Sequence, residues 1–110
     1  MSSRVSLLDR VRDLVKTSAN INLNNHELQD DRLVRNEIRS SFTKALFKSR
    51  FFTVPIVDID LELAQNSDRF TNTLRFGTDK DMLYVRVRSA QLHAGKLVVK
   101  ASYYVSFTAA

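Results

Sequence analysis

In its middle the chain reads Val57-Asp58-Ile59-Asp60-Leu61-Glu62-Leu63, and this stretch decides the fold. Every second side chain is aliphatic, and the side chains between them are acidic. Only a β-strand, whose side chains alternate between two faces, puts all of the aliphatic residues on one side. The stretch therefore predicts a strand over about residues 56–64, with one face in the core and one acidic face toward water or a charged partner.

The pattern before this strand is helical. A stripe of apolar residues predicts a short helix over about residues 4–16, and its members are Val5, Leu8, Val11 and Val15. Ser2 or Ser3 precedes it as a cap. An apolar stripe needs a surface to pack against, which is either the core of this domain or a neighbouring subunit. We take these four residues as candidate subunit contacts.

A second, longer helix is expected over about residues 25–48. Asn24 and Glu27 have the spacing of a capping box, in which each side chain accepts a hydrogen bond from the backbone N–H of the other. The predicted apolar face of this helix consists of Val34, Ile38, Phe42, Ala45 and Leu46. Beside that face, arginines follow one another at helical spacing at positions 32, 35 and 39.

Three more alternating stretches follow the first strand, over about residues 69–76, 82–92 and 96–107. Short polar turns separate them, and one contains Gly77, which suits a positive φ. Turns this short require antiparallel neighbours. The sequence therefore predicts a single α+β domain over residues 1–110: a four-stranded antiparallel meander whose apolar face is covered by the two helices.

Composition excludes several classes of protein. The 110 residues contain no cysteine, and 44% of them are hydrophobic, which is enough for one small core. Disulfides, thiolate metal sites and a cysteine nucleophile are therefore excluded. No apolar run approaches the roughly 20 residues that span a bilayer, and the start of the chain lacks the apolar stretch of a secretory signal. We expect a soluble protein, inside a cell or a particle, with no membrane partner.

The net charge of +5 is unevenly distributed. Residues 1–50 contain ten Lys and Arg against six Asp and Glu, whereas residues 51–110 contain seven against six. A basic surplus favours acidic partners such as nucleic acid, although it also serves solubility alone. The arginines best placed to bind nucleic acid or an acidic partner are Arg32, Arg35, Arg39, Arg86 and Arg88. For those on the helix, the alternative is a solvated flank whose stems cover the edge of the core.

The polar face of the predicted sheet is strongly charged. The first strand presents Asp58, Asp60 and Glu62, and the third and fourth strands present cations and tyrosines. We expect the acidic strand at one side of the sheet and the basic strands toward the other. Three interpretations remain open: an ordinary solvated sheet face whose opposite charges stabilise the sheet across strands, a self-complementary surface for head-to-tail contact between subunits, and a platform for single-stranded nucleic acid.

No motif encodes a reaction. Asp58 and Asp60 are the best material for a metal-dependent nuclease, but alternate residues on a strand stand some 6–7 Å apart, too far to grip one ion without help. His26 and His93 fall at the ends of predicted elements, where histidines are most often solvated. We therefore expect no enzyme, no cofactor, no metal and no small-molecule substrate.

The sequence thus favours a non-enzymatic structural or assembly protein, such as a small subunit of a virion or another multi-copy particle. Its partners are then copies of itself or other subunits, bound through the first helix and through the acidic row of Asp58, Asp60 and Glu62. The alternative is a small basic module that binds nucleic acid with the arginine stripe and the sheet face.

Overall fold

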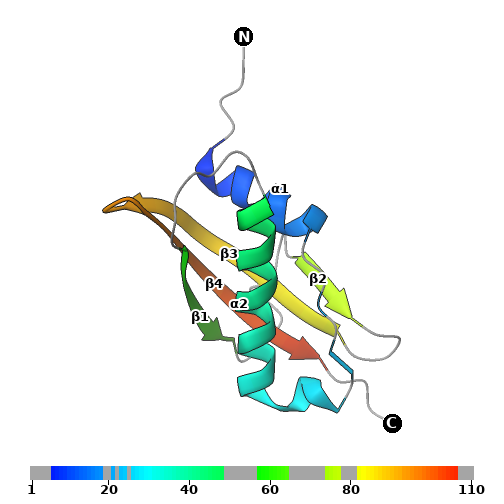
Figure 1. Ribbon diagram of the computed structural model, residues 1–110. Coiled ribbons are helices and arrows are strands. Elements are labelled where there is room, and N and C mark those ends of the chain that lie inside the picture. Colours follow the sequence, from blue (N-terminus) through cyan, green and yellow to red (C-terminus); the bar gives the residue numbers. More distant parts are fainter. Residues whose placement is uncertain are drawn as a thin grey trace.

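The computed structural model describes residues 6–18, 21, 23–24, 26–48, 57–64, 74–77 and 82–106 (Figure 1). Its elements are α1 (Leu7–Ser18), a 3-10 turn η1 (Glu27–Gln29), α2 (Asp31–Lys48), β1 (Val57–Leu63), β2 (Leu74–Gly77), β3 (Met82–His93) and β4 (Lys96–Ser106). The predicted α+β class is confirmed. Val5 and the predicted strand segments 69–73 and 107 lie outside the described residues.

The four strands form one sheet in the order β1-β4-β3-β2. β2 pairs with β3, and β3 with β4, in the antiparallel sense that the short turns predict. The first strand differs, because β1 pairs with β4 and the two run parallel. The antiparallel meander predicted from the sequence is therefore wrong in the place and direction of its first strand.

The connection after β1 permits this position. β4 (Lys96–Ser106) has peptide groups on both of its edges, and it pairs with β3 along one edge and with β1 along the other. Residues 64–73 separate β1 from β2, so no tight turn forces these two strands into a hairpin. In the parallel register Ile59 lies beside Val99 and Leu61 beside Ala101, and the aliphatic side chains of both strands therefore share the core face.

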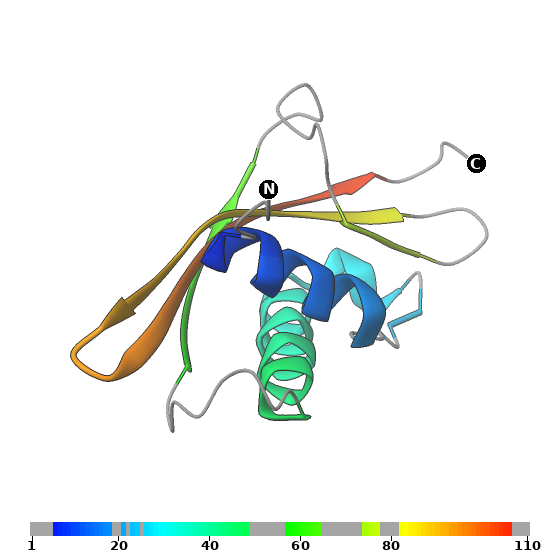
Figure 2. The same ribbon diagram turned by 90° about the horizontal axis from the view of Figure 1, so that it is seen from above.

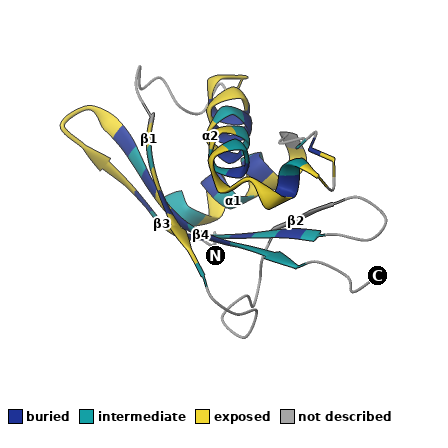
Figure 3. Ribbon diagram, turned by 90° about the horizontal axis from the view of Figure 1, so that it is seen from below, coloured by how far each residue is buried: buried dark blue, intermediate teal, exposed yellow. Residues whose placement is uncertain are grey.

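Both helices lie on the concave side of the bent sheet (Figure 2). α1 packs against α2 and β3, and α2 also contacts β1. The core lies between these layers, while the tip of the β3–β4 hairpin and the outer side of α2 are exposed (Figure 3). The predicted apolar face of α2 is confirmed, since Val34, Ile38, Phe42, Ala45 and Leu46 are all at most 2% exposed.

The helices begin later than the sequence predicts. The capping box forms, with Glu27 N–H donating to Asn24 Oδ1 (2.9 Å) and Asn24 N–H to Glu27 Oε1 (3.3 Å), but it opens only the 3-10 turn η1. Asp30 is extended and caps α2 anew, because its Oδ1 accepts the backbone N–H of Arg32 at 3.0 Å. At α1 the cap is Ser6, whose Oγ accepts the N–H of Asp9 at 3.1 Å; the predicted caps Ser2 and Ser3 lie outside the described residues.

A long-range hydrogen bond fastens α1 to the sheet. The pairing of β3 with β4 shifts register between Val87 and Ser89. At this bulge Arg12 donates to the Val87 carbonyl from both Nε (3.3 Å) and Nη2 (3.0 Å). A bulge disrupts the ladder locally and leaves backbone groups in need of other partners. The contact therefore fixes α1 over β3.

Candidate docking edge

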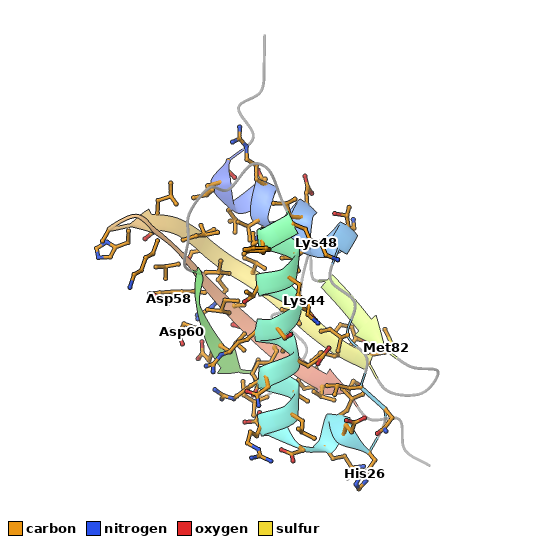
Figure 4. All side chains as sticks on the ribbon, viewed as in Figure 1. His26, Lys44, Lys48, Asp58, Asp60 and Met82 are labelled. Atoms are coloured by element: carbon orange, nitrogen blue, oxygen red, sulfur yellow. The ribbon has the colours of Figure 1, made fainter. Side chains whose placement is uncertain are left out.

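β1 is an outer strand of the sheet, with β4 as its neighbour in the described part of the chain. Its acidic side chains Asp58, Asp60 and Glu62 are all exposed. In Figure 4, Asp58 and Asp60 project from β1 away from α2. Among the described residues, neither Asp58 nor Asp60 belongs to an ion pair. The predicted acidic row is thus placed at an edge of the sheet and turned toward solvent.

The backbone of β1 also has one side on which the described residues place no strand. Ala64 N–H donates to the Tyr103 carbonyl at 2.8 Å, so the even-numbered residues of this strand direct their peptide groups toward β4. Peptide groups alternate sides along a strand, so those of Ile59, Leu61 and Leu63 point outward. A side-chain contact supports this orientation of the Leu61 peptide group. Arg35 of α2 donates a hydrogen bond from its Nη1 to the Leu61 carbonyl at 3.3 Å.

Two hollows lie beside β1. The first is between β1 and α2, has a volume of about 270 Å³ and is lined by Arg39, Thr43, Asp58 and Ile59. The second extends from the end of β1 over β4 to η1 and α2, has a volume of about 200 Å³ and is more apolar; its walls are formed by Leu28, Gln29, Asp31, Val34, Leu63, Ala64, Tyr103, Tyr104 and Val105. Leu63 at its rim is 50% exposed.

The charges of the sheet face are arranged differently from the prediction. We expected acidic and basic strands at opposite sides, but β4 lies directly beside β1, with Asp60 in register with Lys100. Arg88 of β3 even crosses β4 to bind Glu62, at 3.0 Å between Nη1 and Oε2. Cross-strand charge pairing is therefore part of what the face does, although an exposed pair contributes only about 0–1 kcal/mol.

Tyrosines stand on the same face of the sheet. Tyr84 of β3 and Tyr104 of β4 are direct partners in the antiparallel register, and their ring centroids are 6.2 Å apart. Arg86 lies two residues along β3 from Tyr84, and all three side chains are partly exposed. This brings together the aromatic and basic residues that the sequence suggested as a nucleic-acid platform.

The predicted arginine stripe of α2 divides in the structure. Arg32 and Arg39 are exposed. Arg35 is instead bound within the chain, since its Nε donates to Asp31 Oδ2 and to the Tyr103 hydroxyl, each at 2.9 Å. The Tyr103 hydroxyl in turn donates to Asp31 Oδ1. Arg35 therefore holds α2 against β4 and β1, and it is not available to a nucleic acid or an acidic partner as predicted.

This partly buried network shifts two pKa values. The hydrogen bond with Tyr103 is the main reason why the pKa of Arg35 is raised above its ordinary value. Burial, followed by the hydrogen bond to Asp31, raises the pKa of Tyr103 to about 12. The sequence contained one signal of this network, the spacing of four between Asp31 and Arg35. The partner on β4 gave none, because it lies far along the chain.

The apolar stripe of the first helix belongs to the core of this chain. Val11 and Val15 are completely buried, and Leu8 packs against the same cluster. The prediction that these residues contact another subunit is therefore not met by Val11 or Val15, which have no surface left for one. The physical reason is that α1 lies across α2 and β3, so the sheet and the second helix supply the surface that the stripe requires.

The described residues contain neither a metal-binding group nor a membrane-spanning helix. No group of three or more His, Asp or Glu side chains in these ranges could hold a metal ion. None of the helices described is long and apolar enough to cross a membrane. Comparison with protein-family models, with curated proteins and with solved structures gave no match to this chain.

Proposed function

We propose that this protein is a non-enzymatic structural subunit of a multi-copy particle, such as a virion, and that it docks to copies of itself or to other subunits through β1 and the charged face beside it. The observation that carries the proposal is the outer position of β1 with Asp58 and Asp60 exposed and outside the ion pairs of the described residues. The unpaired N–H and C=O groups of an edge strand are a ready template for another chain.

The layout of charge suggests how two copies would meet. The acidic row of β1 lies next to exposed lysines of β4, Lys96 and Lys100. When opposite rows are adjacent, a two-fold rotation between them places each acidic row over the basic row of the other copy. Such a contact is isologous and closes as a dimer, in contrast to the head-to-tail chain that charges on opposite edges would favour.

Charge reversal tests this contact. We expect Asp58→Lys with Asp60→Lys, or Lys96→Glu with Lys100→Glu, to weaken self-association about tenfold or more, because attraction becomes repulsion. Mixing the two variants should restore it, since each then faces a row of opposite charge. Sedimentation velocity at several protein concentrations, in low and in high salt, measures the effect, and salt should weaken the wild-type contact.

A matched control separates the interface from net charge. Asp13→Lys with Glu37→Lys raises the net charge by four, as Asp58→Lys with Asp60→Lys does, but at positions on α1 and α2. We expect this variant to associate like the wild type. A protein that stays monomeric at the highest concentration in low salt, or an equal loss in the control, would contradict self-docking through the acidic row.

Binding of single-stranded nucleic acid is the second candidate function, and the paired Tyr84 and Tyr104 beside Arg86 are the observation in its favour. Stacking of bases on aromatic rings is typical of such platforms. We expect a labelled oligonucleotide to bind with an affinity that falls about tenfold between 50 mM and 200 mM salt. Fluorescence anisotropy measures this, and Tyr104→Ala should weaken binding more than Lys44→Ala on α2. No binding at low salt would remove this candidate.

A further inference from the structure

We propose that β1 accepts an added β-strand from another subunit, and that this strand carries Lys or Arg at alternate positions and apolar or small polar residues between them. This inference rests on the proposed function, because it names how and by what the docking edge is filled. Three features of β1 support it: its outward peptide groups, its acidic row, and the surroundings of Ile59 and Leu63 on the helix side.

The outward peptide groups supply the hydrogen bonds. Those of Ile59, Leu61 and Leu63 point away from β4, so an extended segment laid along β1 would pair with them and continue the sheet. Arg35 already donates to the Leu61 carbonyl, but at 3.3 Å this bond is long, and a carbonyl oxygen has a second lone pair for an incoming N–H. The contact with Arg35 therefore leaves the Leu61 carbonyl able to accept a second hydrogen bond from an added strand.

The two sides of the added strand would meet different surroundings. On the side away from the helices it would face Asp58, Asp60 and Glu62, which are exposed carboxylates that favour Lys or Arg directly opposite. On the helix side it would lie beside the hollow at Ile59 and beside the exposed side chain of Leu63. These residues are four positions apart, or about 13 Å along the strand, so side chains four positions apart in the partner would meet them.

The surroundings of Ile59 and Leu63 specify what those side chains are. Leu63 is half exposed, so an aliphatic side chain beside it would cover its apolar surface. The hollow at Ile59 contains Arg39 and Thr43 and would take a short polar side chain such as Ser or Thr. In this chain the segment Val85–Arg88 has such an alternation of apolar and basic residues, but it already lies within β3. We therefore assign the added strand to a different subunit and not to a second copy.

Amide hydrogen exchange tests the proposal on the unmodified protein. The probe is a synthetic peptide that alternates Lys with Val and Thr, and its control has the same composition with the Lys residues grouped together. At a peptide concentration ten times its Kd, we expect exchange at Ile59, Leu61 and Leu63 to slow about tenfold. The amides of Asp60 and Glu62, which face β4, should be slow with or without peptide.

Two variants at one position separate backbone pairing from side-chain contact. Leu63→Pro removes an N–H that points outward, and proline is tolerated at such edge positions. We expect it to weaken the alternating peptide about tenfold, whereas Leu63→Ala, which keeps the N–H, should weaken it less. An equal loss in both variants would overturn strand addition; if Leu63→Pro does not fold, exchange on the wild type still decides.

The remaining outcomes are equally decisive. No binding, equal binding of the grouped peptide, or binding that leaves the three outward amides unchanged would overturn the proposal. Slowing of the same amides by raising the protein concentration alone would assign the edge to a second copy and overturn the choice of partner. The proposed function fails separately: a strictly monomeric protein whose outward amides are protected by peptide refutes self-docking and leaves strand addition intact.

Discussion

Replacing Phe42 with Ala is expected to lower the free energy of unfolding by about 3–5 kcal/mol, the usual loss for a buried aromatic residue. Phe42 lies on the inner face of α2 and is 0% exposed, in the cluster that joins both helices to the sheet. Removal of the ring costs its transfer from water and leaves a cavity that neighbours from three elements fill only in part. Urea unfolding followed by circular dichroism measures the change.

The same helix offers a matched control. Phe47 lies near the end of α2 and is 89% exposed, so Phe47→Ala removes the same atoms from water. We expect a change within about 0.5 kcal/mol, as is usual for surface substitutions. Similar losses in the two variants would contradict the placement of the core between α2 and the sheet.

These two residues illustrate what periodicity can predict. Phe42 belongs to an apolar stripe at helical spacing, and all five members of the predicted stripe are buried. The inward residues of the strands follow just as directly from alternation, as at Leu83, Val85 and Val87. Side-chain period is a local property of the sequence, so it identifies the buried face without knowledge of the neighbour.

The neighbour itself is harder to predict. Short turns correctly gave the β2–β3 and β3–β4 pairs, but β1 reaches β4 through a parallel contact that no local signal announces. Because β1 pairs with β4, the acidic row lies beside the lysines of β4. The charges then suit a two-fold contact between copies, in place of the head-to-tail contact expected from the sequence. The outward peptide groups of Ile59, Leu61 and Leu63 also follow from topology alone.

Arginines show the same limit at the level of single side chains. On sequence alone Arg35 is equivalent to Arg32 and Arg39, with helical spacing and a place beside the apolar face. Only the fold brings the Tyr103 hydroxyl and the Leu61 carbonyl within its reach. Arg35, which was predicted to bind a partner, therefore connects α2 to the sheet. Loss of this connection should lower the free energy of unfolding.

Removal of the Tyr103 hydroxyl tests that bridge. We expect Tyr103→Phe to lower the free energy of unfolding at pH 7 by about 1.5–3 kcal/mol, the range for hydrogen bonds to charged groups. The hydroxyl donates to Asp31 and accepts from Arg35, so the variant deprives two ionised side chains of a shared partner while the buried ring remains. Tyr104→Phe is the control, because the side chain of this next residue lies on the opposite face of the sheet. It should lower the free energy of unfolding less.

The pH dependence gives the sharper result. Tyr103 is an acid whose pKa rises from 10.0 to about 12 in the folded chain, so folding favours its neutral form. Its stabilisation is fully present below pH 10 and is lost as the pH rises toward 12. The free energy of unfolding should therefore fall between pH 9 and pH 11.5 more steeply in the wild type than in Tyr103→Phe, and the two curves should converge. Curves that stay parallel would show that this hydroxyl does not hold α2 on the sheet.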